Sequence, residues 1–516
     1  MFYIIVFLIL SLLSYFEYKG KYFKYLTFKI LSVILTIISI IRFGQGSDYF
    51  AYLDIYSVVP PISRFSEVAA FEYRVEPTYL FLCSIFKTLD VRFEIFIAII
   101  AIVIMTLIYK FIRDYSKMPI MSLTIFFALY YLIYVFSAIR QGIAMALFLA
   151  LGIPFLKDRK YIRFIIVVLI AATMHSSILI VLLLIPIFEL NISKKLWGAF
   201  IAVALLVMAT GLDVKIIGLL PQFLSSRIVV YWGQMSIPLL AIGNRLIVLL
   251  LILYFSSKIE LDNDTNMMKR IYIISFILYI LTIKSSVISS RISVYMKVFE
   301  IIIIPNIVML LKNQGYYKKT IMLFFVTIIL MLGLLVKNLS AFVYEGSYNS
   351  SVKFYSYPYI TIFDKENIWT YRDKPKNFHR MMEYMPMGIL KPGLYKWNDP
   401  EIYSGNSWID DFHSNYYKGY ALMSNSNNDT MTFKFNGTGF RWHSVSGINC
   451  GIAEVTIDDK TYTVDNYSST LEFNKVVFEK LDLPYGKHVV EIKVTNKKNA
   501  LAKQNFQVVD SIEILE

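Results

Sequence analysis

The sequence predicts a polytopic α-helical membrane protein that continues into an all-β, jelly-roll-like sandwich. Three observations support this fold class. Of the 516 residues, 57% are hydrophobic and only 17% are charged, with a mean hydropathy of +0.57. Before residue 340 the apolar residues gather in blocks suited to crossing a bilayer. The last part of the chain instead alternates apolar and polar residues. This composition excludes a cytosolic globular enzyme.

Apolar runs recur along the first two thirds of the chain, each bounded by charged or turn residues. They predict about 12–13 transmembrane helices, the lower number applying if the short run at 76–89 is a re-entrant or interfacial segment that does not cross. The runs lie at 2–16, 24–41, 76–89, 93–112, 119–138, 141–156, 161–174, 176–190, 196–210, 237–256, 270–283, 292–311 and 320–336.

The orientation of these helices follows from the positions of Lys and Arg. The first run lacks a basic start and a small-residue cleavage site, and Lys19 follows it, so we expect a retained span with an external N-terminus. Basic clusters that mark the cytoplasmic side lie near 110–117, 157–163, 194–195, 258–270 and 312–319. This leaves on the outer side the loops at 42–75, at Arg140, at His175, at 211–236 and at 284–291, with everything after Val336.

The charge of the chain is +14, and the basic excess falls before Glu345. It therefore belongs to membrane loops, where it attracts anionic lipid head groups and diphosphates, and nucleic acid is not expected as a partner. The two cysteines, Cys83 and Cys450, stand far apart and offer no disulfide framework.

After Tyr344 the composition shifts to Tyr, Asn, Ser, Asp and Gly, and period-two segments begin. We expect a membrane domain over 1–340, a linker over 341–392 with a short helix near 378–384, and a β-sandwich over 393–516. Strands are clearest at 431–435, 490–494 and 512–514, and turns are predicted at 436–439, 458–459 and 484–486.

The segment after the second apolar run carries groups suited to a phosphorylated ligand. Arg42 offers a planar fork for phosphate oxygens, Gly44 and Gly46 allow close backbone approach, and Asp48 can accept a proton. A polar turn with a snorkelling arginine explains the same residues equally well.

Further ionisable residues lie at other outer ends of the apolar runs. Arg140 and Gln141 open one run, and His175, the only histidine before residue 345, separates two others. Interfacial anchoring and a water-exposed loop histidine are the ordinary alternatives for these positions. Several cations with carboxylates at one membrane face nevertheless indicate a site for a polyanionic substrate. The other ionisable residues predicted at this face are Glu72, Glu76, Arg245 and Arg291.

Taken in order, these motifs resemble the EpsG family of Wzy-like exopolysaccharide polymerases over about residues 1–340. The motifs are Arg42-x-Gly44-x-Gly46-x-Asp48-Tyr49, Glu76-Pro77-x-Tyr79, Arg140-Gln141-Gly142 and His175-Ser176-Ser177. The resemblance implies a multi-pass glycosyltransferase of the bacterial cytoplasmic (inner) membrane. Such an enzyme joins undecaprenyl-diphosphate-linked oligosaccharide units on the outer face into an exopolysaccharide, capsule or O-antigen. Its implied partners are the lipid-linked oligosaccharide, the nascent polysaccharide and membrane lipids, with a flippase and a chain-length regulator as candidates.

Within this resemblance, Arg42, Gly44, Gly46, Arg140, Gln141 and Arg291 are expected to contact the substrate diphosphate. Asp48, His175 and Glu76 compete for the role of the base that takes the acceptor hydroxyl proton. The sequence shows no nucleotide-sugar motif and no metal-ligand spacing, so neither a cofactor nor a metal is expected.

The region from about 393 to 516 resembles the galactose-binding-like jelly rolls of carbohydrate-binding modules. The resemblance rests on turn and core positions such as Ser404-Gly405-Asn406-Ser407-Trp408 and Leu483-Pro484-Tyr485-Gly486. Trp408, Trp442 and Tyr467 are candidates for stacking on sugar rings, although we expect at least one of the three to be a core residue.

Other functions remain open at this point. A polyprenyl-linked single-sugar glycosyltransferase or a glycan ligase would use the same groups, and so would a membrane acyltransferase. A glycan transporter or sensor with a lectin domain is a further alternative. Charged residues gathered at one face argue against transport, because transporters place their sites near the bilayer midplane.

Overall fold

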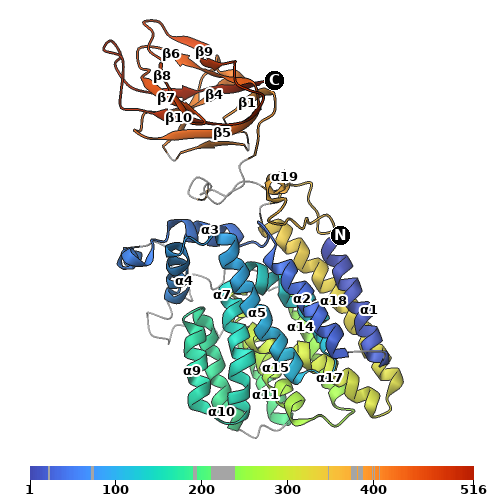
Figure 1. The fold of residues 1–516 in the computed structure, drawn as a ribbon. Coiled ribbons are helices and arrows are strands. Elements are labelled where there is room, and N and C mark those ends of the chain that lie inside the picture. Colours follow the sequence, from blue (N-terminus) through green and yellow to red (C-terminus); the bar gives the residue numbers. More distant parts are fainter. Residues whose placement is uncertain are drawn as a thin grey trace. The chain divides into compact units, whose positions relative to one another are not determined.

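The computed structural model describes the chain except residues 21–23, 71–74, 190–193, 211–238, 347, 373–380, 382–387, 398, 400 and 406. Glu72, the predicted loop at 211–236 and most of the predicted helix at 378–384 lie outside the described residues. The chain forms two compact units, Met1–Phe363 and Asp364–Glu516 (Figure 1). The first is helical and the second is all-β, as the sequence predicts.

The first unit is a bundle of helices (Figure 1). Its described elements are α1 (Phe2–Lys19), α2 (Lys24–Ile40), α3 (Tyr49–Val58), η1 (Ile62–Ala70), α4 (Pro77–Thr88), α5 (Phe93–Tyr115), α6 (Pro119–Phe126), η2 (Phe127–Ser137), α7 (Ile139–Leu147), η3 (Phe148–Gly152), α8 (Ile153–Lys157), α9 (Tyr161–Ala172), η4 (Ser176–Leu183), α10 (Leu184–Glu189), α11 (Lys194–Thr210), α14 (Leu239–Ser256), α15 (Asn263–Leu281), α16 (Ser286–Lys297), α17 (Glu300–Asn313) and α18 (Tyr317–Glu345).

The described part of this unit contains 6 helical stretches long and apolar enough to cross a membrane. They identify a multi-pass membrane protein. Shorter apolar helices of 10–17 residues accompany them between Tyr25 and Ser256. The run at 76–89 forms only the 12-residue helix α4, which begins at Pro77. The longest stretches are Phe2–Lys19, Phe93–Tyr115, Pro119–Ser137, Ile139–Lys157, Val287–Asn313 and Tyr317–Glu345.

Three of these stretches depart from regular α-helix, and Ile139–Lys157 does so at the short π-helix η3. Residues Phe127–Ser137 form a π-helix, η2, which ends where the amide of Ala138 donates to the carbonyl of Ile133 at 2.7 Å. Such segments often lie at functional sites. The predicted run at 292–311 is divided between α16 and α17, with Val298 and Phe299 between them.

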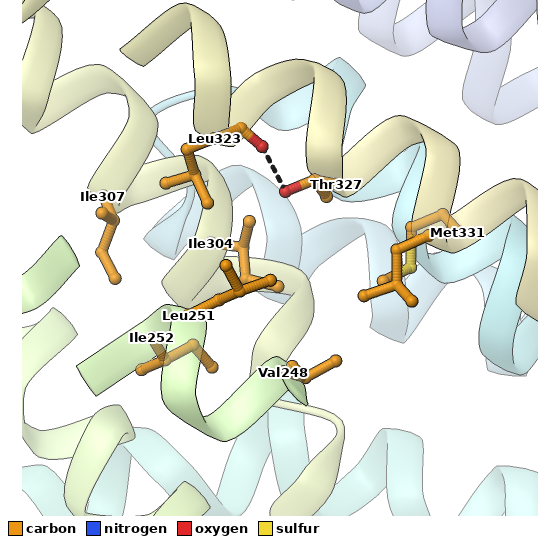
Figure 2. Close-up of a pocket in the computed structure, with 9 residues that line it drawn as sticks. Val248, Leu251, Ile252, Ile304, Ile307, Leu323, Thr327 and Met331 are labelled. Atoms are coloured by element: carbon orange, nitrogen blue, oxygen red, sulfur yellow. Dashed lines mark hydrogen bonds between the residues drawn. The ribbon is translucent and has the colours of Figure 1, made fainter. Parts of the chain in front are cut away.

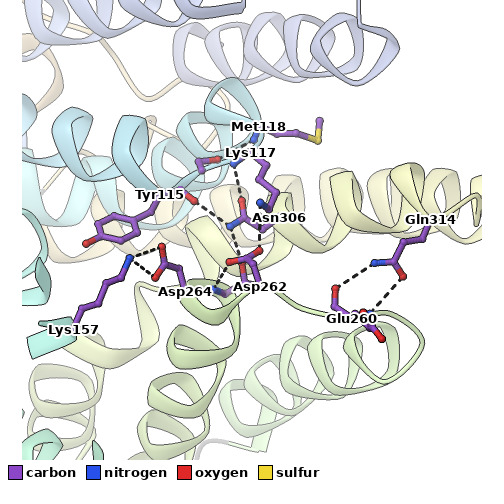
Figure 3. Close-up of polar contacts among 11 residues, drawn as sticks. Tyr115, Lys117, Met118, Lys157, Glu260, Asp262, Asp264, Asn306 and Gln314 are labelled. Atoms are coloured by element: carbon purple, nitrogen blue, oxygen red, sulfur yellow. Dashed lines mark hydrogen bonds and ion pairs between the residues drawn. The ribbon is translucent and has the colours of Figure 1, made fainter.

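Residues from three of the regions predicted to be cytoplasmic lie together at one end of the bundle, namely Lys117, Lys157 and the residues around Asp262 (Figure 3). Lys117 pairs with Asp262 at 3.4 Å and Lys157 pairs with Asp264 at 2.6 Å. The side chain of Asn306 donates to the carbonyl of Tyr115 at 3.0 Å. Asn306 also donates to the hydroxyl of Thr265 at 2.9 Å. Together these contacts fasten the ends of α5 and α8 and the middle of α17 to the start of α15.

The opposite end is closed by a segment that follows α18. The amide of Phe43 donates to the carbonyl of Ile360 at 2.9 Å, and the amide of Ile362 donates to that of Ile41 at 2.8 Å. The side chain of Gln45 donates to Pro358 at 2.7 Å and accepts from Tyr3 at 2.8 Å. Residues 358–362 are therefore a strap across the end of α2, and they belong to the membrane unit.

The helix interior is filled mainly by aliphatic and aromatic side chains. A small gap of about 10 Å³ lies among Val248, Ile304, Leu323 and Met331, whose side chains are drawn in Figure 2. A space of that size holds about one water molecule at most. The only hydrogen bond drawn there runs from the hydroxyl of Thr327 to the carbonyl of Leu323, within α18.

The second unit begins with η5 (Lys365–Asn367) and α19 (Ile368–Tyr371) and continues as antiparallel strands in three sheets, ordered β1-β12-β6-β9, β2-β5-β10-β7-β8 and β11-β4-β3. A short turn of helix, η7 (Tyr417–Gly419), precedes β4. The strands are β1 (Gly393–Lys396), β2 (Ile402–Ser404), β3 (Ile409–Phe412), β4 (Tyr420–Ser424), β5 (Thr430–Gly437), β6 (Gly439–Ser446), β7 (Ile452–Ile457), β8 (Lys460–Asp465), β9 (Glu472–Lys480), β10 (Gly486–Val494), β11 (Gln507–Val509) and β12 (Ser511–Leu515).

The alternation in the sequence sets the core of this unit. In β5 every second residue is buried, and Phe433 lies opposite Val490 of β10. Strand side chains alternate between faces, so the apolar set of β5 faces the core while Thr430, Thr432 and Lys434 face outward. The turns predicted at 436–439 and 458–459 separate β5 from β6 and β7 from β8.

Candidate active site

Glu76 joins three separate segments at the end of the membrane unit that carries the strap. It precedes Pro77 at the start of α4, and its Oε2 accepts a hydrogen bond from Nη1 of Arg140 at the start of α7. Its Oε1 accepts from the amide of Ser176 at 3.2 Å. The guanidinium of Arg140 also lies 5.8 Å from the ring centroids of Tyr52 and Tyr79. One half-buried carboxylate thus gathers the Arg140 and His175 segments.

His175 lies in the turn between α9 and η4, held by two hydroxyl groups. The hydroxyl of Ser177 lies 2.8 Å from Nδ1 of His175 and 2.9 Å from the hydroxyl of Tyr295. Tyr295, on α16, is itself 3.3 Å from the same nitrogen. When Nδ1 donates within this group, Nε2 is left as an acceptor that can take a proton.

The electrostatic setting keeps His175 neutral. Burial lowers its pKa from 6.5 to about 4, with Glu76 opposing that change and the cations Arg140 and Arg291 adding to it. A neutral imidazole at neutral pH is the form that a general base requires.

Gln141 and Arg291 connect α7 with α16. The side-chain amide of Gln141 donates to the carbonyl of Arg291 at 2.9 Å. Among the residues that the structure describes, the guanidinium of Arg291 makes no recorded hydrogen bond or ion pair, and its side chain is exposed. Arg291 is therefore a cation that a ligand at this end of the bundle can reach.

Asp48 lies at the start of α3, on a segment that packs against the end of η2. The hydroxyl of Ser47 donates to Asp48 at 3.1 Å, and the amide of Ser47 donates to the hydroxyl of Ser137 at 2.7 Å. Gly46 has a φ of +101°, and a Cβ there would meet the carbonyl oxygen of Phe136 at 2.5 Å. Glycine is required at that position by conformation and by space.

Arg42 lies in a more enclosed environment than the sequence suggests. Its side chain is buried, with the guanidinium donating to the carbonyls of Ser39 and Val135, the second at 2.9 Å, and lying 4.5 Å from the ring of Phe136. With its fork directed at backbone carbonyls, Arg42 fixes the segment that follows it to the end of η2. Gly44, which adopts a φ of +66°, is buried in the same segment.

A further group of charged residues was not singled out from the sequence. Lys297 and Glu300 lie three residues apart within an apolar stretch, and Lys337 lies in the last long helix. Charged residues inside apolar runs are rare and commonly functional, and this signal was present in the sequence.

In the β unit, the structure places two of the three aromatic candidates in the core. Trp442 is fully buried and donates to the carbonyl of Val508 at 3.1 Å, and Trp408 is 8% exposed and donates to that of Thr430. Neither ring can stack on a sugar while the core is closed. Tyr467 is half-buried beside Gly447.

A cleft of about 530 Å³ in the β unit lies close to these positions. In it the rings of His413 and Phe473 stack at 4.2 Å, and the hydroxyl of Tyr416 donates to Asp411 at 2.6 Å. Phe412 is 74% exposed at its edge. Stacked rings beside a carboxylate suit a ligand that has both apolar faces and hydroxyl groups.

Comparison with known proteins gives one match over most of the membrane unit. A model of the EpsG family matches residues 25–359, more than half of the chain. This range contains every motif on which the sequence resemblance depends, so the resemblance is confirmed.

Two curated relatives from Flavonifractor plautii match a shorter part. An "A type blood alpha-D-galactosamine galactosaminidase" is 36% identical over 91 residues, covering 18% of this chain and 8% of the relative. An "A type blood N-acetyl-alpha-D-galactosamine deacetylase" is 30% identical over 94 residues, covering 18% and 12%. The chain thus spans only a small part of the length of these relatives.

Solved structures with partial similarity include a Paenibacillus xanthan lyase, with 19% identity, coverage of 25% of this chain and 14% of that chain, and a TM-score of 0.21. A family 35 carbohydrate binding module from Clostridium thermocellum shows 12% identity, coverage of 24% and 98%, and a TM-score of 0.17.

Proposed function

The chain belongs to the EpsG family, and from this premise we propose that it polymerises lipid-diphosphate-linked oligosaccharide units into an exopolysaccharide, capsule or O-antigen. Family membership supports a polysaccharide-polymerase-like role. The reaction, the undecaprenyl carrier, the outer face of a bacterial cytoplasmic membrane and an extracytoplasmic β unit are parts of our proposal.

The observation that carries the proposal is the joint placement of Glu76, Arg140 and His175. A polymerase must remove a proton from an acceptor hydroxyl while a diphosphate leaves the donor sugar. The neutral His175 is suited to the first task, and the exposed guanidinium of Arg291 is suited to the second. Glu76 and Arg140 neutralise each other and hold the His175 turn in place.

The proposed reaction proceeds as follows. The hydroxyl of the acceptor sugar gives its proton to Nε2 of His175, and its oxygen forms a bond to the anomeric carbon of the donor. The bond between that carbon and the diphosphate oxygen breaks, and the lipid diphosphate leaves with the bonding electron pair. Asp48 is the alternative base, since it lies on the segment tied to Ser137, three residues before Arg140.

The test is reconstitution of the full chain with a lipid-linked oligosaccharide, followed by mass analysis of the glycan. A ladder of repeat units supports polymerisation, whereas addition of one sugar or transfer to a different acceptor indicates the other glycosyltransferase functions. Dependence on an acyl donor would indicate an acyltransferase. Glu67→Gln is the matched control for Glu76→Gln. Glu67 also pairs with an arginine, Arg64 in η1, but both side chains are more than half exposed.

A second function, glycan binding, is favoured by the cleft of the β unit. The cleft combines the stacked rings of His413 and Phe473 with the carboxylate of Asp411. The two curated relatives are named for action on galactosamine-containing blood-group glycans. A glycan-binding domain tethered to a polymerase would raise the local concentration of the growing chain. Binding of the purified full chain to a glycan array, with Phe412→Ser as the variant, tests this role.

A further inference from the structure

A cavity of about 550 Å³ lies within the membrane unit, among η2, α14, α16 and α18. Its size falls in the range of small-molecule sites, about 300–1,000 Å³. Three cations from three helices line it, namely Arg245, Lys297 and Lys337. The π-helix turns Tyr130 and Tyr134 toward the same space.

One of the cations is fully neutralised by a buried network. Nζ of Lys297 lies 2.7 Å from Oε1 of Glu300 and donates to the hydroxyl of Tyr130 at 3.1 Å. Glu300 is fully buried and also accepts from Tyr130 at 2.5 Å and from Tyr272 at 3.0 Å. Lys297 and Glu300 therefore form a fixed pair with no net charge.

The other two cations have no carboxylate partner among the residues described. Arg245 donates to the hydroxyl of Ser293 at 2.8 Å and stacks 3.6 Å from the ring centroid of Tyr279. Lys337 lines the cavity from α18 without a recorded ion pair or hydrogen bond in the described part of the chain. Uncompensated charge inside an apolar helix is costly. Of the two carboxylates that line the cavity, Glu300 is paired with Lys297, and Glu345 lies eight residues beyond Lys337 on α18. Arg245 and Lys337 are therefore the cations of this cavity that can hold an anion.

The cavity reaches toward the candidate active site. Ser289 and Ser290 line it on α16, and Arg291 follows them directly. On α18 its lining extends from Leu334 to Glu345, about 16.5 Å along the helix at 1.5 Å per residue. It thus leads from the middle of the bundle to the end where Glu76 and His175 meet.

We propose that this cavity binds the diphosphate group of a lipid-linked substrate, with Arg245 and Lys337 as its contacts. The inference rests on the proposed function and adds Arg245 and Lys337 to Arg291 as contacts of the diphosphate, in place of Arg42 and Arg140. Each phosphoryl group of a diphosphate diester carries one negative charge, which matches the two unpaired cations. Lys297 and Glu300 are positioning residues that fix Tyr130, and Tyr134 offers a ring to the attached sugar.

The test measures binding of farnesyl diphosphate to the purified full chain in detergent by titration calorimetry. Lys337→Gln is expected to weaken binding about tenfold, the scale of one charge-assisted hydrogen bond. Arg245→Gln should do the same, and Arg245→Lys should restore part of the affinity. Lys318→Gln is the matched control, because Lys318 is an exposed lysine at the other end of α18.

Further probes distinguish the sources of the anion. Farnesyl monophosphate, inorganic pyrophosphate and phosphatidylglycerol vesicles test whether the cavity needs a diphosphate, a lipid chain or any anionic head group. Equal binding of farnesol and farnesyl diphosphate would overturn the proposal, as would unchanged binding in both Lys337→Gln and Arg245→Gln. Tightest binding of phosphatidylglycerol would also overturn it, in favour of a structural lipid.

The two proposals fail in different ways. If the cavity variants bind farnesyl diphosphate normally while the native chain makes polymer, the cavity assignment is contradicted and the polymerase function is supported. If the native chain makes no polymer but binds farnesyl diphosphate in a Lys337-dependent manner, the cavity assignment is supported and the polymerase function is contradicted.

Discussion

The carboxylate of Glu76, at the start of α4, accepts a hydrogen bond from the guanidinium of Arg140, which lies 64 residues further along the chain at the start of α7. The pair is partly buried, with side-chain exposures of 18% and 21%. An ion pair in this setting depends on both partners, because removal of one leaves the other charge uncompensated. The pair also fixes the His175 turn through Ser176.

We therefore expect Glu76→Gln and Arg140→Ala each to reduce the rate of chain growth about 10²–10³-fold, the scale of a misplaced acid–base group. Single repeat units should accumulate on the lipid while the protein remains inserted. The measurement is the length distribution of glycan made by reconstituted protein. Asp48→Ala tests the alternative base in the same assay. Normal polymer from all three variants would contradict the site assignment.

The pH dependence of chain growth should report His175. Its pKa is lowered to about 4, so the native rate should stay level from neutral pH down to about pH 5 and fall below that. Arg291 contributes to that lowering, so Arg291→Gln should move the acid limb to higher pH. A pH–rate profile of both proteins checks the direction, and a shift to lower pH would be evidence against His175 as the base.

Gly142 is expected to be intolerant of a side chain. A Cβ there would lie 2.0 Å from the carbonyl oxygen of Tyr134, which is backbone and cannot move aside. Gly142→Ala should destabilise the membrane unit by about 1–3 kcal/mol or more, as overpacking does. Gly333→Ala is the control, because a Cβ there meets nothing within 4 Å. Thermal unfolding of both variants in detergent should separate them, and equal melting temperatures would contradict the packing argument.

The β unit contains a pH-sensitive pair, His488 and Asp458, with 2.8 Å between Nδ1 and Oδ2. Burial acts to lower the pKa of His488 from 6.5, but hydrogen bonds to Asp458 and to the carbonyl of Pro484 outweigh it and raise the pKa. Burial acts to raise the pKa of Asp458 from 3.8, yet the contacts with His488 and the amide of Val489 lower it.

The stabilising effect of this pair should therefore be greatest between pH 3.8 and 6.5. The contribution of His488 is lost as the pH rises through its raised pKa, and that of Asp458 is lost as the pH falls through its lowered pKa. Hydrogen exchange of β7 and β10 in the full chain, compared with His488→Gln, measures it. The variant should lose protection mainly below pH 6.5, and an equal loss at all pH values would argue against the pair.

Substitution of Trp442 should lower the stability of the β unit, whereas substitution of Phe412 should weaken glycan binding. Trp442→Ala removes a fully buried ring and should cost about 3–5 kcal/mol of stability. Phe412→Ser changes an exposed ring at the cleft and should leave stability unchanged while weakening glycan binding. Unfolding curves and glycan-array signals of the two variants provide the comparison. Undiminished glycan binding by Phe412→Ser would exclude this cleft as the binding site.

Much of this arrangement could be predicted from the sequence, because the motifs stand at the ends of apolar runs. Alternation of membrane spans predicts Glu76, Arg140 and His175 at one face. In the structure Glu76 binds Arg140 and the amide of Ser176, the residue after His175. The all-β unit was equally readable from period-two alternation.

Other features depended on partners distant in sequence. The burial of Arg42 depends on the carbonyl of Val135, 93 residues away, which no local pattern reveals. The apolar run that forms η2 has no sequence pattern that predicts its π-helical geometry. Lys297 and Glu300 were visible as charges three residues apart in an apolar stretch, but their pairing with Tyr130 required the fold.

The strap at 358–362 has a practical consequence for separating the two units. A chain cut after α18 at Glu345 would lose the backbone partners of Ile41 and Phe43 and leave the side chain of Gln45 without Pro358. Its helices would insert while the Gly44–Asp48 segment lacked its contacts with the strap. A loss of activity would then be wrongly attributed to the absence of the β-sandwich. Chimeras that exchange the β unit should therefore be joined no earlier than Phe363.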